Sequence, residues 1–247
     1  MSRETESVYG RRGLQGGALE PTRQLAISRF VSRTYGWMFL GLMTTGLISY
    51  SIATSEAAVQ MLMENRGLFY LVMFAEFGLV IGLTAAANKI TAAMATLGFL
   101  FYSALNGVTF SVIFLTYTMT SVAQVFMISA GMFGGLALFG TVTRKDLTGV
   151  GTFVGMGLWG LILLGIVNMF VQSSALSLGL SAVGVIVFSG LTAYEAQKIR
   201  LLANQYAGGR QGSEEEGKGA IFGALSLYLN FINLFLSLLR LFGSRRD

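Results

Sequence analysis

A few ionisable side chains lie inside long apolar segments, where burying a charge is costly. Glu76 is the one charged residue between Arg66 and Lys89, Glu195 closes a long uncharged run, and Arg240 lies near the end of the last apolar segment. A charge at the centre of a membrane span costs at least ~2.5–3.5 kcal/mol on insertion scales, so such a residue marks a functional site by default. Isolated carboxylates there can bind or pass a cation. The alternatives are a structural carboxyl at Glu76 and an Arg240 side chain that reaches the membrane surface.

The last apolar segment carries a stripe of polar residues. They follow one another at spacings of 4, 3, 4 and 3: Ser226, Asn230, Asn233, Ser237 and Arg240. This spacing places them on one face of an α-helix, and such a face turns toward protein or a water-filled cavity. We therefore predict that this helix lines an ion pathway formed by Glu76, Ser226, Asn233, Ser237 and Arg240. The alternative is structural, because amides and hydroxyls also bond between helices and contribute about 0.6 kcal/mol each.

The residue types that are missing exclude several kinds of site. The chain has no cysteine and no histidine, so disulfides, thiol nucleophiles, Cys/His zinc sites and His-dependent triads are excluded. No lysine lies in the middle of an apolar segment, which leaves a retinal Schiff base or a Ser–Lys protease site without its amine. We expect no enzyme activity, no catalytic residue and no cofactor. The net charge of +5 lies mainly in the N-terminal arm and the loops, and it indicates no nucleic-acid partner.

The composition indicates a membrane protein. Of the 247 residues, 53% are hydrophobic and 12% charged, whereas soluble domains carry about 25% charged residues. The charges divide the chain into apolar stretches of the length that spans a bilayer. We predict an all-α polytopic membrane protein with seven transmembrane helices, whose lipid-facing side chains have the bilayer as partner. The expected spans are 34–54, 67–87, two within 90–143 that are separated by a turn at 116–121, two within 147–194 that are separated at 172–174, and 219–242.

Three regions and an orientation follow from where the basic residues fall. We expect a basic cytoplasmic arm at 1–33, flexible at first and with a short interfacial helix from Pro21, then the transmembrane domain at 34–242 and a basic tail at 243–247. With the N-terminus in the cytoplasm, thirteen Lys and Arg residues lie inside and four outside, as the positive-inside rule requires. The tail would then lie outside, unless the last helix is re-entrant.

Two motifs resemble a known family. Gly190-Leu-Thr-Ala-Tyr-Glu195-Ala-Gln-Lys-Ile-Arg200 and Leu227-Tyr-Leu-Asn230-Phe-Ile-Asn-Leu-Phe-Leu236 resemble the bacterial branch of the Bax inhibitor (transmembrane Bax inhibitor motif) family. The resemblance covers nearly all the chain after residue 25. It implies a bacterial inner membrane protein whose last helix is central and surrounded by the other six. It also implies a pH-sensitive calcium leak, in which an acid at Glu195 and an aspartate at the position of Asn230 share a proton that closes the pore.

The gate and pH sensor that the resemblance places at Glu195 and Asn230 departs from the family pattern. Glu stands where the family has Asp, and Asn230 replaces a carboxylate with an amide. A carboxyl pair raises the pKa of one member by like-charge repulsion, and a Glu–Asn pair lacks this effect. We therefore expect weaker or acid-shifted pH gating, or a leak with little pH response. Calcium would be held weakly and transiently by Glu195, with Asn230, Glu76 and water as further oxygen ligands.

Two other functions remain open. The first is a non-conducting regulator that binds a membrane protease or another membrane protein, with the basic arm as its docking element. The second is a secondary transporter, although the two halves of the chain show no convincing repeat. The permeant ion, the protein partner and the oligomeric state stay undetermined at this point.

Overall fold

The protein is helical almost throughout the residues that its computed structural model describes, 3–208 and 212–246. An isolated β-bridge joins Tyr117 to Arg245. The helices of the described chain, in order, are α1 Arg3–Ala53, α2 Glu56–Glu64, α3 Arg66–Ala85, α4 Ala92–Thr116, α5 Met119–Val142, α6 Thr148–Val171, α7 Ser174–Tyr206 and α8 Ser213–Phe242.

Seven of these helices are long and apolar enough to cross a membrane, and α2 is the short exception. The prediction of a seven-span all-α membrane protein is confirmed. The span boundaries differ most in α1 and α7, which extend well beyond the apolar cores predicted from the charges. The reason is that a helix continues into polar sequence as long as each added residue gains a backbone hydrogen bond.

Both predicted turns lie between helices, and side-chain caps explain their positions. Thr118 accepts a hydrogen bond from the backbone N–H of Ser121 at the start of α5. Ser173 does the same for Leu176 at the start of α7. Gln172 before it takes a left-handed conformation with φ of 50°, which ends α6. Such caps satisfy N–H groups that a helix start leaves unpaired.

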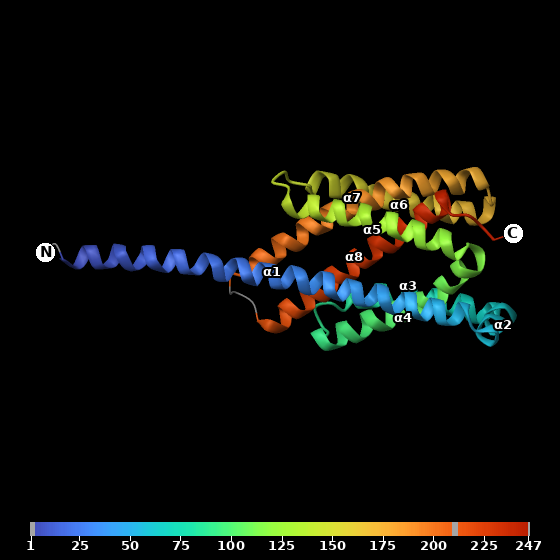
Figure 1. Ribbon diagram of the computed structural model, residues 1–247, viewed down its shortest axis with the longest axis horizontal. Helices are drawn as coiled ribbons and strands as arrows, with labels where there is room; N and C mark the ends of the chain where they lie inside the picture. Colours follow the sequence, from blue (N-terminus) through green and yellow to red (C-terminus); the bar gives the residue numbers. More distant parts are fainter. Residues whose placement is uncertain (1–2, 209–211, 247) are drawn as a thin grey trace.

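The N-terminal arm differs from the prediction of a separate short helix that begins at Pro21. A single helix runs through Pro21, from Arg3 to Ala53, and extends beyond the bundle (Figure 1). Proline removes one backbone N–H and crowds one carbonyl, but the helix continues on both sides of it. The anchor is the inner part of α1, where Phe30 and Thr34 are fully buried. The expected boundary at residue 33 therefore falls inside a helix, and the cytoplasmic side of the arm stays a prediction.

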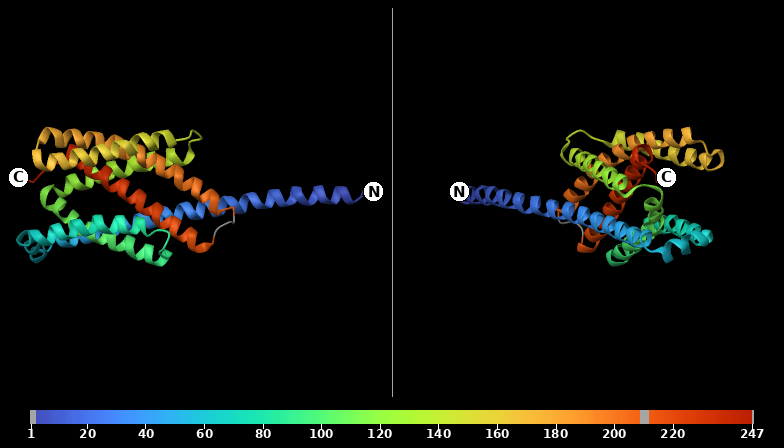
Figure 2. Two further views of the ribbon diagram at one scale, coloured as in Figure 1. Left: turned by 180° about the vertical axis from the view of Figure 1, so that it is seen from behind. Right: turned by 45° about the vertical axis from the view of Figure 1, so that its right-hand side comes forward.

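Helix α8 is the central helix of the bundle, as the family resemblance implied. Two-thirds (67%) of its most apolar window is buried, against at most 33% for any other span. It contacts α1, α4, α5 and α7 and crosses between them (Figure 2). The expectation that all six other spans surround it is wrong, because α3 packs mainly on α4, and α6 packs on α7. Apart from Glu76 of α3, both outer helices are largely apolar, so lipid can cover the faces that protein does not.

The two ends of the chain lie at opposite ends of the bundle (Figure 1). Helix α8 is unbroken from Ser213 to Phe242, and the tail after it lies against the α4–α5 turn. The re-entrant alternative for the last helix is therefore wrong. With a cytoplasmic N-terminus, the basic tail lies outside.

Candidate functional site

A polar cavity of about 540 Å³ lies between α3, α4 and α8. It begins near the middle of the spans and extends toward the end of the bundle that carries the C-terminus. Its polar lining residues come from all three helices: Glu76, Tyr102, Asn106, Thr109, Asn233 and Arg240. The remaining lining is apolar, which keeps these few polar groups in a region of low dielectric where they interact strongly with an ion.

Glu76 provides the negative charge of this cavity. It lies halfway along α3, is half-buried, and accepts a hydrogen bond from the Thr109 hydroxyl of α4. In the described part of the chain, no Lys or Arg forms an ion pair with Glu76. A half-buried carboxylate with one neutral donor and no basic partner can attract a cation.

Two amide side chains add oxygen atoms to the cavity. The Asn106 amide donates to the backbone carbonyl of Tyr102 at 3.2 Å, and the Asn233 amide donates to that of Leu229 at 2.8 Å. Both amides therefore bind their own helices through nitrogen. Both residues line the cavity, and an amide oxygen is a ligand that hard cations prefer.

Aromatic rings close the cavity on its inner side. Tyr102 packs edge-to-face on Tyr228 with ring centroids 6.0 Å apart, and Tyr228 packs on Phe99 at 5.7 Å. Tyr228 is fully buried, and its hydroxyl shares a 2.7 Å hydrogen bond with that of Thr45. Tyr102, which lines the cavity, is therefore packed against a buried aromatic cluster.

The predicted ion-pathway residues of α8 divide into two groups. Asn233 and Arg240 line the polar cavity together with Glu76. Ser237 instead lies against Gly184 of α7 and donates to the backbone carbonyl of Asn233 at 2.7 Å. Ser226 is half-buried and does not line the cavity. A repeat that averages 3.5 residues drifts around an α-helix by ~20° per heptad, so a stripe of this length need not face one helix.

Glu195 and Asn230 lie in the same stretch of the α7–α8 interface. At one end of this stretch Gly223 approaches Ile199, and at the other Gly184 approaches Ser237. The chain positions of Glu195 and Asn230 fall between these two contacts on their antiparallel helices. The two predicted gate residues therefore lie at similar positions along two adjacent helices.

The side chains of this pair are not hydrogen-bonded to each other in the structure. Glu195 is 15% exposed and forms an ion pair with the more exposed Lys198 at 3.3 Å. Asn230 is 8% exposed, and within residues 3–208 and 212–246 no hydrogen bond joins it to Glu195. Their direct contact stays a prediction.

Neighbours of Glu195 in the first motif have structural roles. Gln197 binds two backbone groups of the α5–α6 loop, at residues 145 and 147, with distances of 2.8 and 2.9 Å. Arg200 donates to the backbone carbonyl of Thr141 at 2.7 Å. These bonds fix the inner end of α7 and thereby position Glu195. Within the described residues, the interaction found for the Glu195 carboxylate is the one with Lys198 of its own helix.

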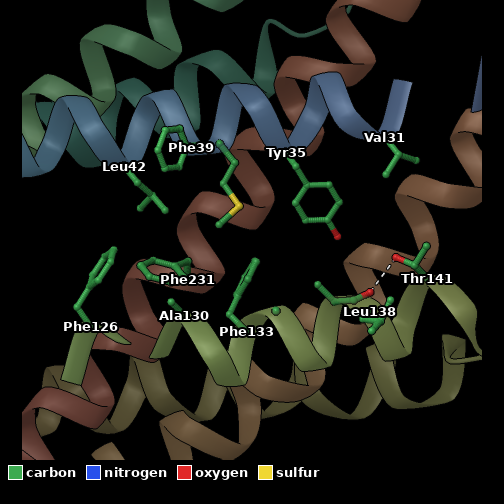
Figure 3. A pocket seen from close by; sticks show the side chains of 13 residues that line it. Val31, Tyr35, Phe39, Leu42, Phe126, Ala130, Phe133, Leu138, Thr141 and Phe231 are labelled. Carbon is green, nitrogen blue, oxygen red and sulfur yellow. Dashed lines mark hydrogen bonds between the residues drawn. The ribbon is translucent and has the colours of Figure 1, made fainter. Parts of the chain in front are cut away.

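A second cavity is unsuited to an ion. It measures about 630 Å³, lies between α1, α5 and α8, and has no charged side chain among its lining residues. Figure 3 shows Phe126, Phe133 and Phe231 along it and the Tyr35 hydroxyl directed toward α5. The Thr141 hydroxyl donates to a backbone carbonyl of its own helix at 2.8 Å. An apolar space of this kind would leave an ion without ligands.

Sequence reasoning missed the polar residues of α4. Tyr102, Asn106 and Thr109 follow spacings of 4 and 3, which place them on one helix face. The same spacing was the signal used for the stripe in α8. These residues lie in an uncharged stretch, so a search for charges alone passes over them.

A tight metal cage does not occur among the described residues, where no group of three or more His, Cys, Asp and Glu could hold an ion. Any cation would therefore meet single carboxylates with amide, hydroxyl and water oxygens. Such ligand sets bind weakly.

Comparison with known proteins identifies the family. The sequence profile described as "Inhibitor of apoptosis-promoting Bax1" matches residues 27–247. The chain belongs to the Bax inhibitor family. This Bax inhibitor family member is 42% identical to the inner membrane protein YbhL of Escherichia coli K12 over 220 residues, which cover 89% of this chain and 93% of YbhL. It is 41% identical to a Deinococcus radiodurans protein, with 90% and 92% covered, and 38% identical to protein RP147 of Rickettsia prowazekii, with the same coverage. The family resemblance drawn from the two motifs is confirmed, and the chain is an integral membrane protein.

Proposed function

We propose that this Bax inhibitor family member is a cation leak pathway of the bacterial inner membrane, with calcium as the permeant ion and with Glu195 and Asn230 as a gate whose response to pH is weak or shifted to acid pH. One observation carries the proposal: Glu76, a half-buried carboxylate that forms no ion pair within the described residues, lies in a polar cavity that begins near the middle of the spans. Intramembrane carboxylates of this kind mark ion pathways.

The route has an outer and an inner part. The outer part is the cavity between Arg240 and Glu76, whose lining includes the amide residues Asn106 and Asn233. The cluster of Phe99, Tyr102 and Tyr228 closes it inwardly in this conformation. Glu195 lies in the inner half of the bundle, so an ion that passes the rings would meet a second carboxylate there. Weak ligands at both carboxylates favour passage, because an ion held tightly cannot leave.

The decisive measurement is calcium flux into proteoliposomes loaded with a calcium-sensitive dye. Glu76→Gln keeps the shape of the side chain and removes its charge. Flux should fall at least about tenfold. A tenfold change needs a loss of only about 1.4 kcal/mol of attraction between the ion and the site, and two unit charges near a protein surface interact by ~4 kcal/mol at 4 Å. Glu64→Gln is the matched control, since Glu64 is exposed on α2 and lines no part of the cavity.

Equal flux in the wild type and in Glu76→Gln would contradict the proposed route. Absence of flux in the wild type at every pH between 5 and 8 would contradict the leak itself. Glu64→Gln should behave as the wild type, and a matching loss there would show that the effect of charge is not local.

The alternative function is a regulator that binds a membrane protease or another membrane protein. One observation favours it: α1 extends beyond the bundle as a helix, without another helix along its outer part (Figures 1 and 2). Deletion of residues 1–25 separates the two functions. It should abolish capture of a partner and leave calcium flux unchanged if the extension serves docking alone.

A further inference from the structure

A second polar cavity, of about 440 Å³, lies at the C-terminal end of the bundle. It is bounded by the start of α7, the end of α8, the α4–α5 turn and the tail. Its polar lining residues are Tyr117, Ser174, Ser177, Ser181, Arg240 and Arg245. Arg240 also lines the cavity of Glu76, so the two cavities are adjacent.

The tail is fixed in place, and this positions Arg245. The backbone N–H of Thr118 donates to the carbonyl of Ser244 at 3.1 Å, and that of Arg246 donates to the carbonyl of Thr116 at 2.9 Å. These bonds flank Arg245 on both sides. The backbone of Arg245 is therefore already ordered before any ligand binds, so binding loses less conformational entropy.

Both arginines of this cavity lack a counter-charge in the described chain. Arg240 and Arg245 are exposed, neither forms an ion pair there, and no Asp or Glu lines the cavity. Two guanidinium groups beside one cavity repel each other, and an anion between them would remove this repulsion. The hydroxyls of Tyr117, Ser174 and Ser177 in the lining can donate further hydrogen bonds, whereas that of Ser181 already donates to the backbone carbonyl of Ser177.

The start of α7 adds to the positive potential. The helix begins at Ser174, and the side chain of Ser173 caps the N–H of Leu176 at 3.3 Å. Other N–H groups of the first turn have no partner within the helix, and the helix dipole is positive at this end. Ser174 and Ser177 from this turn line the cavity together with the arginines.

We propose that this cavity binds a phosphate group, supplied either by inorganic phosphate or by the headgroup of an anionic phospholipid. The planar forks of two arginines match phosphate oxygens bidentately, which makes phosphate a better fit than a halide. Arg240 lies in the last turn of a membrane-spanning helix, at the depth where lipid headgroups lie. Both sources therefore reach the cavity from the outer surface.

Binding to the purified full chain tests this site. One arm titrates inorganic phosphate into detergent-solubilised protein by calorimetry. The other counts bound phosphatidylglycerol by native mass spectrometry, with phosphatidylcholine as the zwitterionic reference. Arg245→Gln and Arg240→Gln should each weaken binding at least about tenfold, because each removes a charge and its charge-assisted hydrogen bonds to the phosphate. Thermal unfolding confirms that each variant is folded.

Arg246→Gln is the matched control. It removes the same charge from the next residue, whose side chain does not line the cavity, and should change binding by less than about twofold. Binding of phosphate alone, or of phosphatidylglycerol in preference to phosphatidylcholine, supports the site and identifies its source. Failure of the wild type to bind either probe overturns the proposal. An equal loss in Arg246→Gln and Arg245→Gln also overturns it, because the effect would then be one of overall charge.

Discussion

The hydroxyl of Thr109 on α4 donates a hydrogen bond to the carboxylate of Glu76 on α3. This bond joins an outer helix to the bundle. Helix α3 packs mainly on α4, and none of its most apolar window is buried. This bond therefore adds a polar interaction to an otherwise apolar, lipid-exposed contact, and it fixes the carboxylate in the cavity.

Thr109→Val should loosen this contact. The substitution keeps the shape of the side chain and removes the donor, so the free energy of unfolding should fall by about 1–2 kcal/mol. Denaturation by dodecyl sulfate in mixed micelles measures the change. Thr96→Val is the control, because the Thr96 hydroxyl donates only to the carbonyl of Ala92 in its own helix. Equal losses in the two variants would show that the bond to Glu76 adds nothing to the stability.

Asn230→Asp should strengthen the pH dependence of calcium flux. It places a second carboxylate near Glu195, and two close carboxylates hold a shared proton more readily than a Glu–Asn pair does. Flux through the wild type should change little between pH 6 and 8, whereas flux through the variant should fall as the pH drops. Asn204→Asp adds the same charge farther along α7 and should leave the profile unchanged. Identical profiles for the wild type and Asn230→Asp would contradict the proposed gate.

The sequence predicted the spans well because charges and caps mark their ends. The turns near Thr118 and Ser173 carry cap residues whose effect is local. The course of α1 through Pro21 was missed, since a single proline weakens a helix without ending it when both sides favour it. Which helices contact α8 could not be predicted from the sequence either, because α3, apart from Glu76, and α6 are largely apolar and show no face that must turn toward protein.

The candidate site was predictable in part. Glu76 was found because a lone charge in an apolar segment is conspicuous, but its partner Thr109 was not, since a threonine is neutral and common. Ser237 was assigned to the ion pathway from its spacing, yet it contacts Gly184. Helical spacing determines which residues share a face and says nothing of which neighbouring helix that face meets.

Tyr102→Ala should raise the basal calcium flux. The Tyr102 ring lies between the polar cavity and the buried ring of Tyr228, so its removal opens the inner end of the cavity. Tyr102→Phe keeps the ring and should conduct as the wild type does. Phe101→Ala removes a neighbouring ring that is 59% exposed to the lipid side and serves as the control. Unchanged flux in Tyr102→Ala would show that the aromatic cluster is not the barrier.

Gly140→Ala should destabilise the contact between α5 and α7. A methyl group at Gly140 would collide with the backbone carbonyl of Ala193, and a backbone atom cannot turn aside as a side chain can. We expect a loss of about 1–3 kcal/mol, the usual cost of overpacking. Gly134→Ala in the same helix meets no atom within 4 Å and should be neutral or stabilising, since alanine favours helix. Equal unfolding temperatures for the two variants would contradict the close approach of the helices.

Asp146 should make the stability depend on pH at the acid end. Its carboxylate accepts hydrogen bonds from the Thr148 hydroxyl at 2.6 Å and from the Thr148 N–H at 2.9 Å at the start of α6. These bonds, that of the hydroxyl first, hold the pKa of Asp146 below its ordinary value. A lowered pKa in the folded state means that the stabilisation is complete above the unfolded value of about 3.9 and is lost as the pH falls through the folded value.

The unfolding temperature measured between pH 6 and pH 2.5 checks this contribution. Asp146→Asn cannot titrate, so it should lose less stability over this range than the wild type does. Thr148→Val removes the stronger of the two donors and keeps the backbone N–H, which should give an intermediate slope. The loss of unfolding temperature on acidification should be largest in the wild type, smaller in Thr148→Val and smallest in Asp146→Asn. Each step removes part of the difference in proton affinity between the folded and unfolded states. Parallel curves for the three proteins would show that this cap does not contribute to the acid sensitivity of the fold.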